Sequence, residues 1–354
     1  MEEKKDTLGM LDLVIRPGFC VKENQIIKVN QAAESLFITP GTDVRSLLLT
    51  GSEEYAAFTG GCLYLTLNLS SHSCGASVTR VDDIDVFLLE QESDNGELRS
   101  MALAARELRE PLTNVMITAD SLFPLCAAES SPRTAEQVAR LNRGLFQILR
   151  IIGNMSDAER CAAVSHQETV DIPALFAEFF EKAETLVSHT GITLTYEGPD
   201  QPIYGLADRE QLERAVLNIL SNAIKFTPKG GTVTAKLTRS GRMLRLSVTD
   251  SGSGIAQSVR SSVFSRYLRQ PALEDSRYGI GLGMVLIRTA AAHHGGAVLI
   301  DQPDGAGTRI TMTMSIRQSK QATLRSNVLR VDYAGERDHG LIELSECLPT
   351  ELYE

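Results

Sequence analysis

Two adjacent stretches of the chain repeat their apolar residues at three- and four-residue steps, the spacing of one face of an α-helix. The first begins near Asp94 and carries Leu98, Met101, Ala105, Leu108, Leu112, Val115, Thr118 and Leu122. The second follows a break at Ser130-Ser131-Pro132 and carries Val138, Leu141, Leu145, Ile148, Leu149, Ile152 and Met155. Two long amphipathic helices joined by a short loop form an αα-hairpin, and such hairpins commonly pair into a four-helix bundle. The sequence therefore predicts a helical hairpin over residues 94–165 that dimerises.

A different pattern fills residues 10–92, where short extended runs alternate with turn residues. The runs are Phe19-Cys20-Val21, Ile26-Ile27-Lys28-Val29, Leu63-Tyr64-Leu65-Thr66-Leu67 and Val86-Phe87-Leu88-Leu89. Alternation in the third run is typical of a half-buried strand. Asn30 precedes a short helical stretch and is expected to cap it. The region is expected to be a small α/β domain in which two strands, short helices and three further strands follow one another.

This order resembles a PAS sensory domain, and Val29-Asn30-Gln31-Ala32-Ala33 is similar to that family's turn out of its second strand. The resemblance implies a sensor at residues 10–92. Four aromatic side chains either line a ligand pocket there or fill the core, namely Phe19, Phe58, Tyr64 and Phe87. The core is the expected place, because aromatic residues in so small a domain are most often buried against one another.

Composition excludes several classes of function. The 354 residues are 43% hydrophobic and 23% charged, which suits a globular chain of two or three domains. A net charge of -10 opposes binding to a phosphate backbone, so nucleic acid is not an expected partner. No run approaches the roughly 18 to 20 apolar residues of a membrane span, and the acidic start is unlike a signal peptide. A cytoplasmic protein is expected, with its six scattered cysteines reduced rather than metal-bound or paired.

Residues 167–316 mix strands with helical segments. Alternating or β-branched runs predict strands at Ile192–Tyr196, Thr232–Leu237, Leu244–Val248 and Thr308–Met314. Together with the helical segments they predict an α/β sandwich, so the chain as a whole is expected to be an α+β multidomain protein. The tail over residues 317–354 contains one candidate strand, Val328–Val331, and an ending from which no role is predicted.

Four signals within the sandwich region point to nucleotide chemistry. Asn218 and Asn222 are four residues apart and share a helical face, where an amide oxygen can bind a Mg²⁺ ion that bridges phosphates. Lys225 follows one turn later and can reach a phosphate oxygen. Asp250 comes directly after a strand, where its carboxylate can accept from an adenine amino group, while Gly252 and Gly254 permit a tight turn.

The other two signals lie further along the chain. Phe264 belongs to the run Val263–Tyr267, which precedes a polar stretch able to close as a lid. The run Gly279-Ile280-Gly281-Leu282-Gly283-Met284 opens an apolar helix, and free N–H groups at a helix start bind polyphosphate.

Each signal alone is common, but their occurrence in this order closely resembles the catalytic and ATP-binding domain of sensor histidine kinases, a member of the GHKL (Bergerat-type) ATPase fold. The resemblance covers about residues 98–314 and includes Glu107-Leu108-Arg109 and Pro111-Leu112 in the hairpin. It implies ATP and Mg²⁺ as cofactors, with Asn222 holding the metal and Asp250 selecting adenine. The nucleotide-binding set that it implies is Asn218, Asn222, Lys225, Asp250, Gly252, Gly254, Phe264, Gly279, Gly281, Leu282, Gly283 and Thr308. A sheet of this fold without nucleotide is the alternative, and His293-His294 is expected to be structural.

The phosphoacceptor box departs from the family. Arg106 stands where the resemblance implies the phosphoacceptor histidine, and a protonated guanidinium has no lone pair with which to attack phosphorus. Glu107 retains the neighbouring acid as a catalytic candidate. Glu110 replaces the threonine or asparagine that assists dephosphorylation of a response regulator. Arg106 and Glu110 either form an exposed ion pair, or Arg106 supplies a fixed positive charge for an acidic regulator surface or the γ-phosphate.

Three functions remain in competition. In the first, the chain is a histidine-kinase-family protein of a two-component system or phosphorelay that phosphorylates something other than its own residue 106. It would act in a homodimer or in a heterodimer with another histidine kinase, which could itself be the target. Alternatively, it is a pseudokinase scaffold that binds ATP and pairs with signalling proteins such as a response regulator. A slow ATPase is least favoured, because GHKL ATPases carry a glutamate base where this chain has Asn218, and an amide cannot accept the proton of water.

Overall fold

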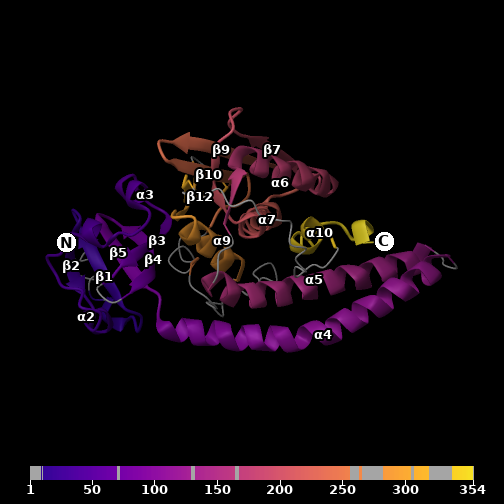
Figure 1. Ribbon diagram of the computed structural model, residues 1–354, viewed down its shortest axis with the longest axis horizontal. Helices are drawn as coiled ribbons and strands as arrows, with labels where there is room; N and C mark the ends of the chain where they lie inside the picture. Colours follow the sequence, from indigo (N-terminus) through magenta and orange to yellow (C-terminus); the bar gives the residue numbers. More distant parts are fainter. Residues whose placement is uncertain are drawn as a thin grey trace.

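The computed structural model describes residues 9, 11–69, 72–128, 132–163, 167–255, 263–264, 282–303, 307–318 and 337–353. Figure 1 shows an N-terminal unit at one end of the molecule, a long helical hairpin along one side, and a mixed unit of helices and strands above the hairpin. We call these parts the N-terminal unit (residues 11–90), the hairpin (92–163) and the sandwich unit (168–315). Residues 337–353 form the C-terminal segment. Strands and helices are both abundant, so the α+β class is confirmed.

The N-terminal unit has the predicted order of strands and short helices. Its elements are η1 (Leu11–Leu13), β1 (Gly18–Lys22), β2 (Gln25–Val29), α2 (Gln31–Glu34), η2 (Val44–Leu47), α3 (Ser52–Ala56), β3 (Cys62–Asn68), β4 (Ser73–Val81) and β5 (Ile84–Leu89). The strands form an antiparallel sheet in the order β2-β1-β5-β4-β3. Asn30 caps α2 as predicted, because its side chain accepts from the Ala33 N–H at 3.0 Å. Assignment of this unit to the PAS family stays a prediction.

Three of the four aromatic residues fill the core of the N-terminal unit. Phe19, Phe58 and Phe87 are buried there, and the rings of Phe19 and Phe87 stack with centroids 4.7 Å apart. The expectation was wrong for Tyr64, which packs with the core of the sandwich unit instead. The reason is alternation along β3: Leu63 and Leu65 face the core of the N-terminal unit, so Tyr64 between them faces the other way.

The hairpin consists of α4 (Glu92–Ala128) and α5 (Pro132–Ala163), which pack along one another. Part of the predicted apolar stripe is buried within the chain, including Leu112, Leu145 and Leu149. Other apolar residues of the hairpin remain exposed, namely Leu103, Leu108, Val115, Ile117, Leu122, Leu141, Ile148 and Ile151. These exposed residues are the surface that the predicted four-helix bundle would cover, and dimerisation stays a prediction. None of the described helices has the length and apolarity that crossing a membrane requires.

The sandwich unit places helices on one face of a mixed sheet. Its helical elements are α6 (Ile172–Val187), η3 (Ser188–Thr190), α7 (Arg209–Phe226) and α9 (Leu282–His293). The main strands are β7 (Thr193–Glu197), β9 (Thr232–Ser240), β10 (Met243–Asp250), β11 (Val298–Asp301) and β12 (Arg309–Ser315), and a separate pair is formed by β6 (Glu168–Asp171) and β8 (Tyr204–Ala207). Strand β7 runs parallel to β9, while the other pairings are antiparallel. The sequence analysis predicted neither β11 nor the β6–β8 pair.

One strand pairing joins the N-terminal and sandwich units. Strand β3 pairs antiparallel with β11, with Tyr64 opposite Val298 and Cys62 opposite Ile300. The two sheets therefore form one ten-stranded sheet in the order β2-β1-β5-β4-β3-β11-β12-β10-β9-β7. Ala297, just before β11, is buried in the core of the N-terminal unit. This continuity was not anticipated from the sequence.

The C-terminal segment is folded against the hairpin and the sandwich unit. It contains α10 (His339–Glu343) and the short turn η4 (Thr350–Tyr353), which contact α5, while α10 also contacts α7. Figure 1 shows α10 above α5, next to α7. Asp338 caps α10 by accepting from the Leu341 N–H at 2.9 Å. The candidate strand Val328–Val331 lies outside the described residues.

Candidate nucleotide-binding site

Helix α7 positions the asparagine motif. Asp208 caps the helix by accepting from the Gln211 N–H, so the chain turns cleanly from β8 into α7. Asn218 is 1% exposed, and its Nδ2 donates to the Arg214 carbonyl at 2.9 Å and to Glu343 Oε2 at 3.3 Å. Its Oδ1 is buried and accepts no hydrogen bond within the described parts of the chain. A buried acceptor without a donor is costly, so this oxygen is suited to a cation or a donor supplied by a ligand.

Gly283 lies directly opposite that oxygen. A side chain at this position would place its Cβ 2.6 Å from Asn218 Oδ1, so a glycine is required for helix α9 to start this close to α7. Asn218 and Gly283 come from two different predicted motifs, and the fold brings them together. The start of a helix also carries backbone N–H groups without partners in the helix, which attract anions.

Asp250 forms a second corner of the site. It is buried at the end of β10, and its Oδ1 accepts from the Gly252 N–H at 2.8 Å and the Thr308 N–H at 3.2 Å. Burial raises the pKa of Asp250, although these hydrogen bonds act in the opposite direction. A Cβ at Gly252 would collide with the Phe226 carbonyl. The predicted motifs at residues 250–254 and 307–308 therefore meet, and their glycines allow close backbone approach.

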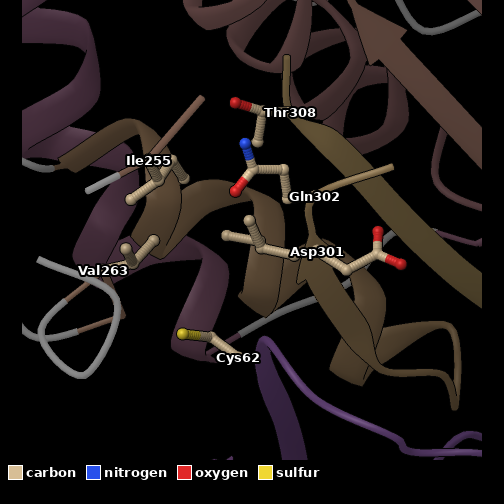
Figure 2. Close-up of a pocket in the computed structure, with 7 residues that line it drawn as sticks. Cys62, Ile255, Val263, Asp301, Gln302 and Thr308 are labelled. Carbon is tan, nitrogen blue, oxygen red and sulfur yellow. The ribbon is translucent and has the colours of Figure 1, made fainter. Parts of the chain in front are cut away.

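A narrow cavity lies next to Thr308. Cys62 of β3 lines it together with Ile255, Val263, Ile300, Asp301, Gln302 and Thr308 of the sandwich unit (Figure 2). Its volume of about 10 Å³ is room for roughly one water molecule, well below the ~300 Å³ of a small-molecule site. This cavity is therefore too small to hold a nucleotide by itself. One wall of the cavity comes from the N-terminal unit.

Phe264 is fixed from two sides. It is 4% exposed, and its carbonyl accepts from Arg288 Nη1 at 2.9 Å. Its ring lies 5.6 Å from the ring of Tyr64, centroid to centroid. The Arg288 guanidinium also lies over the Tyr64 ring and forms an ion pair with Glu90 at 2.5 Å. The sequence analysis missed Arg288, although a lone charged residue within the apolar run from Val285 to Ala292 was a visible signal.

The remaining site predictions fall in several places. Asn222 is half-buried on α7, and Lys225 Nζ forms an ion pair with Glu346 Oε2 at 2.8 Å. Leu282 is buried and packs with Val285 against Met101 and Met155 of the hairpin. Gly254 has a positive φ of 75° and lies beside Gln302 and the Gly307 carbonyl. Gly279 and Gly281 lie outside the described residues.

The altered phosphoacceptor box lies on the exposed side of α4. Arg106 and Glu107 are both exposed, as is Glu110. Among the ion pairs formed within the described residues, none joins Arg106 to Glu110, so the exposed ion pair considered for them is not present. Arg109 instead reaches across the hairpin to the Ser156 hydroxyl at 3.3 Å.

His294 has a structural environment, as expected. It is 2% exposed, its Nε2 accepts from the Asp208 N–H at 3.0 Å, and its Nδ1 lies 2.7 Å from the Ala290 carbonyl. These partners fit a neutral ring with the proton on Nδ1. Burial lowers the pKa of His294, which favours that neutral form.

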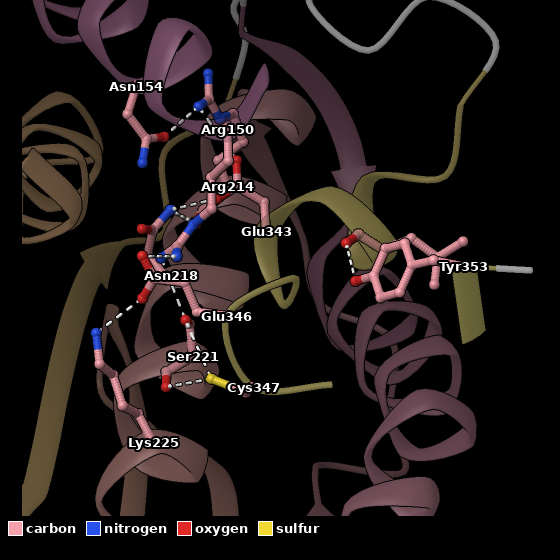
Figure 3. Close-up of polar contacts among 11 residues, drawn as sticks. Arg150, Asn154, Arg214, Asn218, Ser221, Lys225, Glu343, Glu346, Cys347 and Tyr353 are labelled. Atoms are coloured by element: carbon pink, nitrogen blue, oxygen red, sulfur yellow. Dashed lines mark hydrogen bonds and ion pairs between the residues drawn. The ribbon is translucent and has the colours of Figure 1, made fainter. Parts of the chain in front are cut away.

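A cluster of charged side chains that the sequence analysis missed borders the asparagine motif (Figure 3). Glu343 of α10 is fully buried and contacts Arg150 of α5 at 3.3 Å and Arg214 of α7 at 3.2 Å. Glu346 contacts Arg150 at 3.1 Å in addition to Lys225. No local sequence pattern predicts this cluster, because its members come from three distant parts of the chain.

Comparisons with known proteins agree with this geometry. Residues 207–318 match the family described as histidine kinase-, DNA gyrase B-, and HSP90-like ATPase. The uncharacterized sensor-like histidine kinase R01002 of Rhizobium meliloti is 28% identical over 276 residues, which are 73% of this chain and 52% of that protein. The adaptive-response sensory kinase SasA of Synechocystis is 28% identical over 264 residues, covering 70% of this chain and 68% of that protein.

A solved structure shares the fold. The crystal structure of full-length ShkA in complex with AMPPNP matches with a TM-score of 0.51 at 24% identity, over 62% of this chain and 46% of that chain. The chain spans 52% to 64% of the length of the first two curated relatives that it matches. The ordered motifs, the sandwich unit and these relatives lead to one conclusion: the chain belongs to the sensor histidine kinase family and carries that family's GHKL-type ATPase domain.

Proposed function

We propose that this chain is an ATP-binding signal-transduction protein of a two-component system, built as a cytoplasmic sensor kinase but unable to accept a phosphoryl group at residue 106. The observation that carries the proposal is the pairing of a prepared nucleotide site with an altered acceptor. Asn218 Oδ1 is buried opposite Gly283 and accepts no hydrogen bond from the residues that the structure describes, whereas Arg106 is exposed on α4.

The residues of the site fit Mg²⁺ and ATP. The amide oxygens of Asn218 and Asn222 suit Mg²⁺, and no cluster of acidic, histidine or cysteine ligands competes for a metal within the described residues. The Asp250 carboxylate is held in place by two backbone N–H groups, so it is oriented to accept from an adenine amino group. Bound ATP would supply the γ-phosphoryl group for transfer. In the family's reaction, Glu107 would take a proton from a phosphoacceptor histidine at residue 106. Arg106 cannot act as that phosphoacceptor, because its guanidinium has no lone pair.

The exposed apolar residues of the hairpin support a dimer as the working state. A homodimer would cover them with a second copy, and a heterodimer with another histidine kinase would cover them with a similar hairpin. A response regulator is the expected further partner. In the heterodimer, the ATP bound by this chain serves the histidine of the partner, so the loss at residue 106 does not remove kinase activity.

A pseudokinase scaffold is the second candidate. It binds ATP and changes its association with other signalling proteins without transferring phosphate. The exposed Arg106 on α4 supports this candidate, because a protonated guanidinium has no lone pair with which to accept a phosphoryl group. Rapid ATP hydrolysis is disfavoured, since Asn218 occupies the position of the general base.

The test is incubation of the chain with Mg²⁺ and γ-labelled ATP, beside Arg106→His and Asn222→Ala. Acid-labile label on Arg106→His alone would mean a competent nucleotide site that has lost only its acceptor. Label on the natural chain that disappears in Asn222→Ala would overturn the assignment of residue 106. Label transferred to an added partner kinase supports the heterodimer, and binding of ATP without any label supports the scaffold.

A further inference from the structure

The C-terminal segment supplies two carboxylates to the two side chains of α7 that are predicted to face nucleotide phosphates. We propose that this segment is a built-in competitor of the phosphates: Glu343 anchors it between α5 and α7, and Glu346 occupies Lys225 until a nucleotide displaces it. The inference rests on the proposed nucleotide site and names the regulation of that site.

The segment is folded well enough to act as a defined ligand. Its apolar side chains are buried, including Ile342, Leu344, Leu348 and Tyr353. Tyr353 packs edge-on against Phe146 of α5 with ring centroids 5.3 Å apart, and its hydroxyl donates to the Leu341 carbonyl at 2.8 Å. Arg143 of α5 donates to the carbonyls of Ser345 at 2.8 Å and Glu346 at 3.0 Å. These contacts place residues 343–347 at a fixed position on the hairpin.

Glu343 is the fixed point of the contact. It is 0% exposed and lies between two guanidinium groups, with a further hydrogen bond from Asn218. Burying a carboxylate is unfavourable unless charged and hydrogen-bonding partners surround it, and here they do. Because Arg150 belongs to the hairpin and Arg214 to the sandwich unit, Glu343 also joins these two parts of the molecule.

Glu346 is positioned so that a nucleotide phosphate can replace it at Lys225. Its side chain is 32% exposed, so it can turn to solvent, whereas withdrawal of Glu343 would leave two buried guanidinium groups without its charge. Although burial acts to raise it, the charges of Arg150 and Lys225 keep the pKa of Glu346 below its usual value. Glu346 is therefore ionised at neutral pH, and a carboxylate is the same kind of acceptor for an ammonium group as a phosphate oxygen.

Occupancy of Lys225 decides the competition. Its Nζ lies 2.8 Å from Glu346 Oε2 and its side chain is 14% exposed, so there is little room for a second anion beside Glu346. Among the described residues, the two carboxylates of this segment contact three cations, Arg150, Arg214 and Lys225. A polyphosphate carries a larger negative charge than the single carboxylate of Glu346, so it is the stronger partner for the Lys225 ammonium group.

Thermodynamic linkage connects the affinity for nucleotide to the stability of the C-terminal segment. If Glu346 and nucleotide exclude each other at Lys225, removing the carboxylate must tighten nucleotide binding, and nucleotide must loosen the segment by the same factor. The effect should depend on phosphates, since adenosine has no group to place at Lys225.

The experiment is titration calorimetry of the full chain with Mg·AMPPNP and, separately, with adenosine. Glu346→Gln keeps the shape of the side chain and is expected to bind Mg·AMPPNP about fivefold or more tightly, within the usual range of coupling between sites. Its affinity for adenosine should equal that of the natural chain. Glu351→Gln is the matched control, because Glu351 lies in the same segment and is exposed. In a Lys225→Met background, Glu346→Gln should have no further effect.

The outcomes separate this inference from the proposed function. Equal affinity of the natural chain and Glu346→Gln for Mg·AMPPNP would overturn the competition and leave the nucleotide site intact. Failure of every folded variant to bind nucleotide would overturn both. Equal tightening for adenosine would show a general loosening instead of competition, and would also overturn it. As an independent readout, amide hydrogen exchange in residues 341–348 should accelerate when Mg·AMPPNP is added, and unchanged exchange would contradict the inference.

Discussion

The sandwich unit is held by two interfaces that differ in one component: the first contains a strand pairing, and the second a cluster of charged side chains. On the side of the N-terminal unit, β3 and β11 pair through their backbones, and Ala297 inserts into an apolar core. On the side of the hairpin, Leu282 and Val285 pack against Met101 and Met155, and a charged cluster around Glu343 and Glu346 adds ion pairs to this apolar contact. Backbone pairing is independent of the charge of any side chain, whereas the cluster responds to charge, pH and competing anions. The strand pairing is therefore expected to be insensitive to pH, and the charged cluster to be sensitive to it.

The largest expected effect comes from removing the anchor of the charged interface. Glu343→Ala would leave Arg214 and Arg150 buried with less compensating charge, and breaking such a buried pair costs about 3–5 kcal/mol. The free energy of unfolding in urea should fall by this amount. Glu351→Ala in the same segment should change it by less than about 0.5 kcal/mol. Equal effects for the two substitutions would mean that the cluster does not hold the interface.

A smaller loss is expected when the strand interface is disturbed through Gly61. This residue has a φ of 90°, and a Cβ there would collide with the Ile300 carbonyl of β11. Gly61→Ala should therefore lower the free energy of unfolding by about 1–3 kcal/mol and accelerate amide exchange in β11. Gly60 has no neighbour within 4 Å of a Cβ, so Gly60→Ala is the control. If both substitutions behave alike, close approach of β3 to β11 is not needed for stability.

The smallest expected effect is the loss of stability in Glu346→Gln, and its pH dependence distinguishes the charged cluster from the strand pairing. Glu346→Gln should lower stability by about 0.2–1 kcal/mol at pH 7, because its ion pairs are partly exposed. The Glu346 pKa is lower in the folded chain than its unfolded value of about 4.3, so its contribution is complete above that value and is lost as pH falls through the folded pKa.

The thermal midpoints of the natural chain and Glu346→Gln should therefore differ at pH 7 and converge once the pH has fallen below the lowered pKa of Glu346 in the folded chain. The difference between the natural chain and Gly61→Ala should remain at both pH values, since no titrating group causes it. A pH-independent difference for Glu346→Gln would contradict a role of its charge.

Features set by short stretches of sequence were predictable. The two long helices, the predicted strands of the sandwich unit and the Asn30 cap each depend on residues within a few positions of one another. Asp250 and Thr308 could be placed together because they belong to motifs with a known order. The pairing of β3 with β11 could not be predicted. Both strands have ordinary alternation, and no local sequence pattern specifies which sheet edges pair with each other.

The C-terminal segment shows the same limit more strongly. Its α-helix has only five residues, and its stability comes from partners on α5 and α7 that lie more than 100 positions away in sequence. Glu343 has no pattern that distinguishes it from an exposed glutamate, because burial by two arginines is a property of the assembled fold. Asn218 and Lys225 were correctly singled out as polar residues of one helix, but their observed partners were not foreseen.

The continuous sheet has a consequence for how the molecule can open. Each of β3 and β11 has a single partner besides the other, so separating the two units would create two bare strand edges within one chain. Bare edges recruit other strands, and in a dimer the closest complementary edge belongs to the second copy. Opening would then lead to exchange of N-terminal units between copies, so that the N-terminal unit of one copy pairs with the ATPase domain of the other without any new surface being required.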